Sequence, residues 1–341
     1  MSTDPSRASG TSPDDALPPV EPPSAGFIVQ LFVVPGVIVL VVILIWVLFN
    51  WLAQKGNDGE AFVRDLARNN PGRWQAAFNL AHELRAEHES KQPRLTADPK
   101  LAEKLGGILA DEMEAGSTEE KAVALRVYLC RALGEFKVPD GLPVLLEAAT
   151  TVRSEDEADV RRAALEGIAV LANNVGPEDS HFADNAELEE VLIEAASDSD
   201  PRTRSVAAVG LGVVGTPAML ENLEFMLGDA NPDVRYNAAT RLAQRGDPVA
   251  TDVLVEMLDP EETAGVEAEK QEEMRPFKRA LIMVNALRAV EQLAAQNDEA
   301  DLDELQEAVD KLLASNPDSG IRLEAKDVRR RLAEREPAGV E

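Results

Sequence analysis

A pattern of one basic and three apolar residues recurs along most of the chain and restricts its fold more than any other feature. Arg204 is followed by Ala207, Ala208 and Leu211, so the apolar residues lie three, four and seven positions after the arginine. This spacing places all four side chains on one face of an α-helix. Equivalent copies begin at Arg73, Arg126, Arg161 and Arg235, and weaker copies begin at Lys278 and Arg322.

Shorter apolar segments of helical periodicity alternate with these copies, and each unit is therefore predicted to be two helices joined by a tight turn. A single helix pair cannot bury both of its apolar faces, so the pairs must stack on one another. The sequence thus predicts an all-α fold, an α-solenoid of antiparallel helix pairs, over residues 56–334. The shorter helices are expected at residues 61–69, 101–113, 142–149, 188–196, 217–227, 249–258 and 302–314.

The turns before the longer helices carry residues that favour helix starts. Asp200-Pro201 and Asn231-Pro232 each place a capping side chain directly before a proline. The ring of proline fixes the backbone in the conformation of a first helical turn, and the preceding side chain can accept a hydrogen bond from a free backbone N–H. These turns support the assignment of helix pairs.

The two most regular copies resemble the HEAT-repeat family, in particular the short bacterial HEAT-like units named after phycobilisome lyases. Their sequences are SDSDPRTRSVAAVGLG, which begins at Ser197, and DANPDVRYNAATRLAQ, which begins at Asp229. The resemblance implies a HEAT-like superhelix in which the repeat arginines line up along the stack. It further implies that these arginines pair with carboxylates in turns of the same or adjacent repeats. The arginines concerned are Arg126, Arg161, Arg204 and Arg235.

An uncharged apolar run begins at Phe27 and ends at Leu52. At about 1.5 Å per residue, a helix of this length exceeds the roughly 30 Å of a bilayer's hydrocarbon core. The run is longer than the apolar part of a signal peptide and has no cleavage-like site after it, so we expect one uncleaved transmembrane helix. Trp51 suits an anchor at the membrane surface, and Pro35-Gly36 is expected to kink the helix or mark its start.

Basic residues are unequally distributed around this run. Only Arg7 precedes it, whereas Lys55, Arg64 and Arg68 follow closely. The positive-inside rule therefore predicts a single-pass membrane protein with its solenoid in the cytoplasm. Residues 1–26 are rich in Pro, Ser and Asp and are expected to be a disordered tail, and residues 335–341 a flexible C-terminus.

The charge of the chain restricts its partners. The formal net charge is −28, from 62 acidic against 34 lysine and arginine residues, and aromatic residues make up only 4%. Nucleic acid binding depends on basic side chains and on aromatic stacking, so we expect no nucleic acid partner. The same charge favours protein partners with a basic surface.

The segment GLGVVG, from Gly210 to Gly215, matches the G-x-G-x-x-G fingerprint of dinucleotide-binding turns. That fingerprint requires a preceding strand, and here a helix precedes it. Gly215 is instead predicted to end that helix, as Gly246 does in the next copy. Gly210 and Gly212 align with Arg241 and Ala243, so the repeat itself does not require glycine there.

Other candidate sites are predicted to be structural or incidental. His82 and His88, in HELRAEH, are six positions apart and cannot share a zinc ion on one helix face, so they are expected to be solvated. Cys130 lies in an apolar helical pattern and is predicted to be a buried thiol, and the loop residue His181 is expected to be incidental. The acidic run at residues 155–159 is expected to be a solvated helix start, with weak Ca²⁺ binding as the alternative. No catalytic, cofactor-binding or metal-binding residue is predicted.

The absence of converging reactive groups in the sequence predicts a function by binding. The expected function is that of a membrane-anchored, non-enzymatic scaffold or adaptor for protein partners. The alternative is a lyase-like or assembly-factor activity on a chromophore or cofactor protein, which the HEAT-like resemblance suggests.

Overall fold

The computed structural model describes residues 24–55, 59–68, 70, 72–90, 93–152, 154–267, 269–315 and 317–334. Within these ranges every regular element is helical. The chain divides into two units, one up to Asp58 and one from Gly59 onward. Residues 1–23 of the expected tail (residues 1–26), the expected C-terminus at residues 335–341 and the side chain of Trp51 lie outside the described part.

The first unit consists of consecutive helical segments, α1 (Ala25–Ile28), the π-helical η2 (Val29–Val33) and α2 (Val34–Lys55). Among the described residues, Val29–Phe49 is the one helical segment long and apolar enough to cross a membrane. The π-helical turn ends at Val33, shortly before Pro35. Proline has no backbone N–H to donate within a helix, and its ring clashes with the carbonyl group four residues earlier. The proline therefore alters the helix locally, and the helix continues beyond it.

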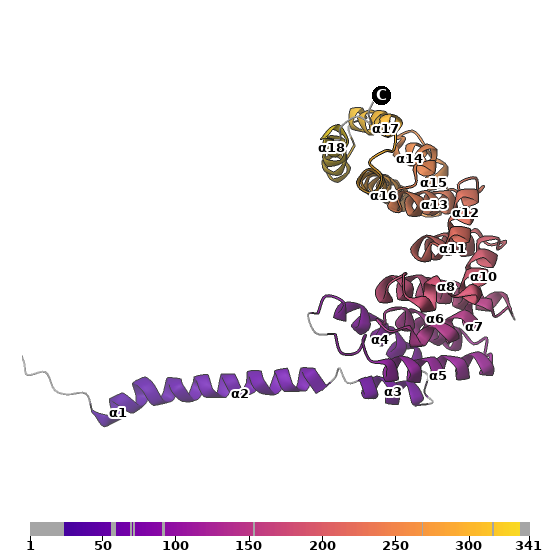
Figure 1. Ribbon diagram of the computed structural model, residues 1–341. Coiled ribbons are helices and arrows are strands. Elements are labelled where there is room, and N and C mark those ends of the chain that lie inside the picture. The colour runs from indigo at the N-terminus through magenta and orange to yellow at the C-terminus, as the bar shows by residue number, and fades with distance from the viewer. Residues whose placement is uncertain are drawn as a thin grey trace, which may run out of the picture. The chain divides into compact units, whose positions relative to one another are not determined.

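The second unit is built from helix pairs in chain order (Figure 1). The first helices of the pairs are α3 (Gly59–Ala67), α5 (Pro99–Ala115), α7 (Leu142–Thr150), α10 (Ala186–Ala196), α12 (Pro217–Met226), α14 (Thr251–Leu258) and α17 (Asp303–Ala314). The second helices are α4 (Arg73–Glu87), α6 (Glu120–Gly134), α8 (Ala158–Val175), α11 (Pro201–Val214), α13 (Pro232–Gln244), α16 (Arg275–Gln296) and α18 (Ser319–Glu334).

The second helices form one continuous row in which each packs on the next, from α4 to α18. The first helices form a parallel row outside it, and the second-helix row lines the inner side of the resulting arc (Figure 1). Ala207, Ala208 and Leu211 of the repeated pattern are all fully buried. The predicted all-α solenoid of stacked helix pairs is confirmed.

Local sequence explains where the central helices start and stop. The side chain of Asp200 accepts a hydrogen bond from the backbone N–H of Arg202, and Asn231 does the same for Asp233. Gly215 ends α11 in the left-handed conformation, with φ of 65°. Glycine adopts this conformation without the steric penalty of a Cβ atom, so the predicted helix end is confirmed.

The connections after α8 and after α14 contain short elements that the sequence analysis did not predict. The connection after α8 holds α9 (Ser180–Ala183), and its Phe182 is fully buried in the core. The connection after α14 holds α15 (Ala264–Glu267) and the 3₁₀ turn η6 (Glu272–Met274). Helix α8 itself continues to Val175. These connections are therefore part of the packed structure.

Candidate protein-interaction surface

Each repeat arginine lies beside a carboxylate of the following helix pair. Arg204 makes the best-defined contact, because its Nε lies 2.7 Å from one carboxylate oxygen of Asp229 and its second terminal nitrogen lies 2.8 Å from the other. The other pairs are Arg73 with Glu112, Arg126 with Glu157, Arg161 with Asp198 and Arg235 with Glu256. These arginines are thus distributed along the stack, and each forms an ion pair that links two neighbouring repeats.

The contact between Arg204 and Asp229 shifts the pKa values of both side chains. The hydrogen bond from Arg204 holds the pKa of Asp229 below its usual range, and the same contact raises the pKa of Arg204. A further nitrogen of Arg204 donates to the backbone oxygen of Asp198, 2.9 Å away. One guanidinium therefore connects two turns, and its fork geometry leaves little capacity for a ligand.

Two groups that the sequence analysis expected to be solvated are not. Glu157 is 2% exposed, and its carboxylate lies 3.3 Å from Arg126, which is fully buried. His88 is half-buried, with its Nε2 2.9 Å from the backbone oxygen of Glu135. Both predictions were wrong because they considered only the helix that carries each residue, whereas the neighbouring helix covers it.

The structure also shows where the remaining candidate residues, Cys130, His82 and His181, lie. Cys130 is buried, and burial raises the pKa of its thiol to about 12, so this thiol stays protonated at neutral pH. His82 is exposed, as expected, and His181 is exposed beside Asp179. In the described part of the chain, no group of three His, Cys, Asp or Glu residues is arranged to hold a metal ion.

Two glycines of GLGVVG lie in close contacts between helices. A Cβ atom on Gly212 would lie 2.3 Å from the Cβ of Arg241 on α13, and one on Gly210 would lie 2.8 Å from Leu192 on α10. The inference that the repeat does not require glycine there missed these contacts, since it compared aligned positions and not neighbouring helices. The segment ends an α-helix and has no preceding strand among the described residues.

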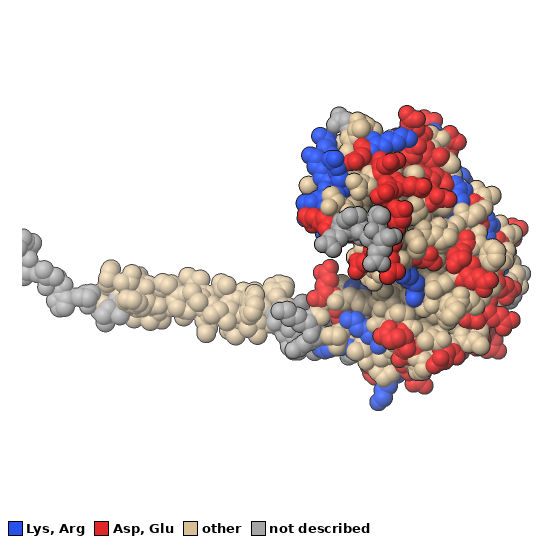
Figure 2. Space-filling view, turned by 45° about the horizontal axis from the view of Figure 1, so that its top comes forward, with Lys and Arg blue, Asp and Glu red and all other residues tan. Residues whose placement is uncertain are grey.

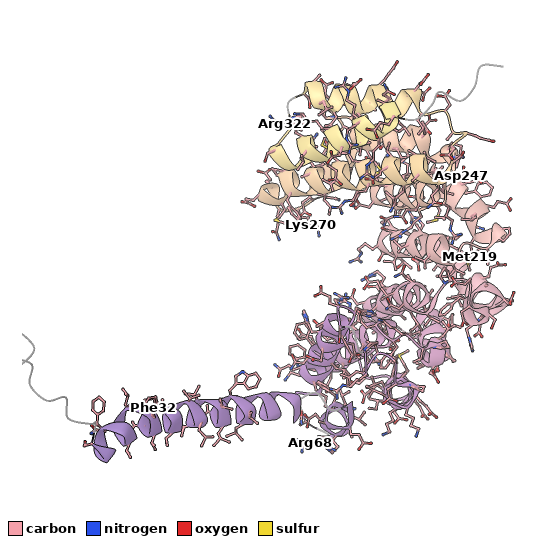
Figure 3. All side chains as sticks on the ribbon, turned by 60° about the vertical axis from the view of Figure 1, so that its left-hand side comes forward. Phe32, Arg68, Met219, Asp247, Lys270 and Arg322 are labelled. Atoms are coloured by element: carbon pink, nitrogen blue, oxygen red, sulfur yellow. The ribbon has the colours of Figure 1, made fainter. Side chains whose placement is uncertain are left out.

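Exposed apolar side chains mark the solvent face of the second-helix row at both of its ends. Phe78 lies on α4, and Phe277 and Leu281 lie on α16, where Phe277 is 63% exposed. Leu323 on α18 and Met274 just before α16 are also exposed. Lys270 lies beside the opening of the arc near α16 (Figure 3). Large exposed apolar side chains that share a face are typical of interaction surfaces.

A groove lies between α6 and α8 on this face, with a volume of about 400 Å³. Its apolar lining comes from Val123, Ala124 and Val127 of α6 and Ala163 of α8. Val127 lies on the opposite side of α6 from the fully buried Leu129. The groove is therefore open to solvent on the second-helix face and separate from the core.

An aromatic cluster forms the wall of the groove toward α4. The Tyr128 ring lies 5.1 Å from the Phe78 ring in an edge-to-face arrangement and 6.3 Å from the Trp74 ring in a stacked one. The guanidinium carbon of Arg131 lies 5.8 Å from the centre of the same Tyr128 ring. Aromatic residues and arginine are the side chains that most often dominate binding energy at protein interfaces.

Charged residues border the groove unevenly. Glu120 and Asp159 lie at the N-terminal ends of α6 and α8, and Arg131 and Glu166 lie 3.4 Å apart further along the two helices. Arg162 is engaged by Asp159 and by Asp200. Acidic side chains also dominate the face of the second unit seen in Figure 2. The groove thus combines an apolar floor with an acidic end.

Comparison with known proteins supports the repeat assignment. The family model for HEAT repeats matches residues 188–271, which begin within α10 and extend beyond α15. The chain carries HEAT-like repeats. No curated protein matches the chain. A crystal structure of an engineered protein, a structural genomics target, is similar at 17% identity with a TM-score of 0.37, covering 81% of this chain and 97% of that one.

The groove and its aromatic wall were missed by the sequence analysis. Trp74, Phe78 and Tyr128 follow the helical period of two separate copies, so their spacing alone indicates only faces of helices. One signal was present, since this chain is poor in aromatic residues and places three of them at two adjacent second helices. Only the packing of α4 on α6 brings them together.

Proposed function

We propose that the protein is a membrane-anchored, non-enzymatic scaffold that binds protein partners on its second-helix face. The observation that carries this proposal is the concentration of exposed apolar and aromatic side chains on that face, at the α4–α6 end and at the α16–α18 end. HEAT-like solenoids offer extended faces of this kind, and large surfaces suit macromolecular partners. The net charge of −28 favours partners with a basic surface.

The anchor in this proposal is the apolar run from Phe27 to Leu52. Side chains throughout its described part are exposed, including Leu40 at 57% and Ile43 at 51%. Apolar side chains with no protein contacts are stable in a lipid environment and unfavourable in water. The cytoplasmic position of the solenoid and the domain boundaries at residues 1–26, 27–52, 56–334 and 335–341 belong to the same proposal.

A crosslinking experiment tests the binding face. A photoreactive amino acid replaces Phe277 on the second-helix face or Phe225 on α12, which is 76% exposed and serves as the matched control. The full chain is expressed in its native membrane, and defined crosslinked proteins are expected from position 277 and not from position 225. Equal crosslinked products at positions 277 and 225 would contradict the proposal. The absence of products both from position 277 and from a photoreactive residue at position 78 would also contradict it.

A second experiment tests the anchor. Replacing both Leu40 and Ile43 with arginine places two charges near the middle of the apolar segment, at a cost of about 3 kcal/mol each. The doubly substituted chain is expected to leave the carbonate-resistant membrane fraction, while the chain with Leu40→Ile stays in it. Retention of both variants in that fraction would rule out this segment as the anchor.

The alternative of a lyase-like or assembly-factor activity predicts a different observation. Such a protein would carry or transfer a chromophore or cofactor, so the purified full chain would bind one stoichiometrically. Absorbance spectroscopy of the protein extracted in mild detergent distinguishes the two functions, since a scaffold is expected to be colourless and folded without any ligand.

A further inference from the structure

We propose that the groove between α6 and α8 binds a peptide segment of a partner protein that inserts an apolar side chain and places a lysine or arginine beside Glu120. This inference rests on the proposed scaffold function and specifies the chemistry of one of its binding sites. Three observations support it: the lining of the groove, its rigid aromatic wall and the position of its charges.

The floor of the groove suits an aliphatic or aromatic side chain. Val123, Ala124 and Val127 are only partly buried, so an inserted side chain would remove their remaining apolar surface from water. Removal of apolar surface from water favours binding roughly in proportion to the area removed. The volume of about 400 Å³ lies within the range of sites that hold a few large groups.

The wall of the groove is held in place before any partner binds. The Tyr128 ring contacts the rings of Phe78 and Trp74, and the guanidinium of Arg131 lies over it. A side chain fixed by such contacts loses little conformational freedom on binding, which favours affinity. Phe78 itself is 38% exposed and extends the apolar surface beyond the groove toward α4.

The charges of the groove favour a basic residue at one end. Glu120 is exposed and makes no ion pair within the described part of the chain, whereas Asp159 is engaged by Arg162. At the other end Arg131 and Glu166 balance each other. An added cation beside Glu120 therefore gains an attraction that no residue of the described chain already supplies. The net charge of the whole chain attracts the same kind of segment.

A peptide is favoured over other ligands by the shape and charge of this face. The groove follows two neighbouring helices, α6 and α8, so it offers a linear path for consecutive side chains. Nucleic acid is disfavoured by the net charge of −28. The proposal accordingly commits to a short polypeptide segment with both apolar and basic residues.

The test uses the full chain in detergent micelles and three fluorescein-labelled synthetic peptides of equal length. The first has leucines and a phenylalanine flanked by lysines, the second replaces the lysines with glutamates, and the third replaces the apolar residues with serines. Fluorescence anisotropy is expected to show at least tenfold tighter binding of the first peptide than of either other one. Similar affinities for all three peptides would overturn the proposal.

Variants locate the binding. Val127→Asp places a charge on the groove floor and is expected to weaken binding of the first peptide at least tenfold, and Glu120→Lys should weaken it about fivefold at low salt. Phe225→Ala, on another helix row, is the control and should bind as the unmodified protein does. Circular dichroism checks the fold, and Tyr128→Ala gives a second test should Val127→Asp unfold the repeat. Unchanged binding to folded groove variants would overturn the inference.

The outcome can be separated from that of the proposed function. If no peptide binds the groove but partners still crosslink to position 277, the scaffold function stands and the groove inference fails. If neither the peptides nor the crosslinks appear, both proposals fail.

Discussion

The junction between α6 and α8 and the junction between α11 and α13 join equivalent helices of the solenoid by different means. At the first, Gly134 and Gly167 allow the helix backbones to touch. A Cβ atom on Gly134 would lie 2.8 Å from the Cα of Gly167, and one on Gly167 would lie 2.6 Å from the backbone oxygen of Cys130. The fully buried Arg126 adds an ion pair with Glu157.

At the second junction, Gly212 of α11 also lies close to Arg241 of α13, and partly exposed polar groups make further contacts. Arg204 binds Asp229 through two hydrogen bonds, and Asn237 donates to the side-chain oxygen of Ser205 at 2.7 Å. Arg245 donates to the backbone oxygens at the C-terminal end of α11, with Nε 2.9 Å from that of Gly212. This guanidinium satisfies carbonyls that the helix itself leaves without partners.

The comparison shows that one repeat architecture tolerates two kinds of interface. Close packing around glycine is sensitive to added volume and nearly independent of pH and salt. Hydrogen-bonded ion pairs near the surface tolerate changes of shape but respond to protonation and, where exposed, to ionic strength. The following substitutions test this division and are given in decreasing order of their predicted effect on stability.

Replacing Arg126 with methionine should have the largest effect. The change leaves the buried Glu157 without this guanidinium, which typically costs about 3–5 kcal/mol. A marked fall in the thermal unfolding midpoint of the full chain, followed by circular dichroism, is expected. The double substitution Arg126→Met with Glu157→Gln should recover much of the loss, because it also removes the buried charge. A double variant no more stable than the single one would contradict this account.

Replacing Gly167 with leucine should destabilise the chain by about 3 kcal/mol, because the side chain would collide with the backbone of α6. Gly107→Ala is the control, since a Cβ atom there meets nothing within 4 Å. That change in the middle of α5 should stabilise the protein by about 0.5–1 kcal/mol. The same thermal measurement compares both variants, and equal effects of the two would refute the close contact of α6 with α8.

Asp229→Asn should cost about 1–3 kcal/mol at pH 7, because it removes a charge-assisted hydrogen bond. The pKa of Asp229 is lowered in the folded protein, so its contribution is complete above the ordinary carboxyl pKa near 4 and is lost as pH falls through the folded pKa. The difference between the unmodified chain and this variant should therefore shrink below about pH 4. Unfolding midpoints of both proteins measured from pH 7 to pH 3 check this prediction. A difference between the two midpoints that stays constant with pH would contradict it.

Arg202→Ala should have the smallest effect, below about 0.5 kcal/mol. Arg202 lies on the same helix as Arg204 and pairs with Asp200, but its side chain is 72% exposed. Water and salt screen such a contact, so the variant should match the unmodified chain in 1 M NaCl. A loss of stability as large as that of Asp229→Asn would show that exposure does not determine how much Arg202 and Arg204 each contribute.

Much of the fold was predictable from local sequence. The positions of the second helices follow from the repeated arginine and apolar pattern, and Asp200, Asn231 and Gly215 mark helix ends by their own backbone and side-chain chemistry. The candidate surface was less predictable. The sequence predicted binding by an extended face, but it indicated neither the groove at Val127 nor the aromatic contacts of Tyr128.

Features that depend on neighbours along the chain follow from the amino-acid order alone: helical periodicity, capped ends, the apolar run and the excess of acidic residues. The packing of the helices is needed to explain which carboxylate meets each arginine, why Gly134 and Gly167 have no side chains, and why Glu157 is buried. The physical reason is that these features depend on how closely and at what offset two helices pack. Connections of unequal length separate those helices, so no fixed spacing in the sequence records their contacts.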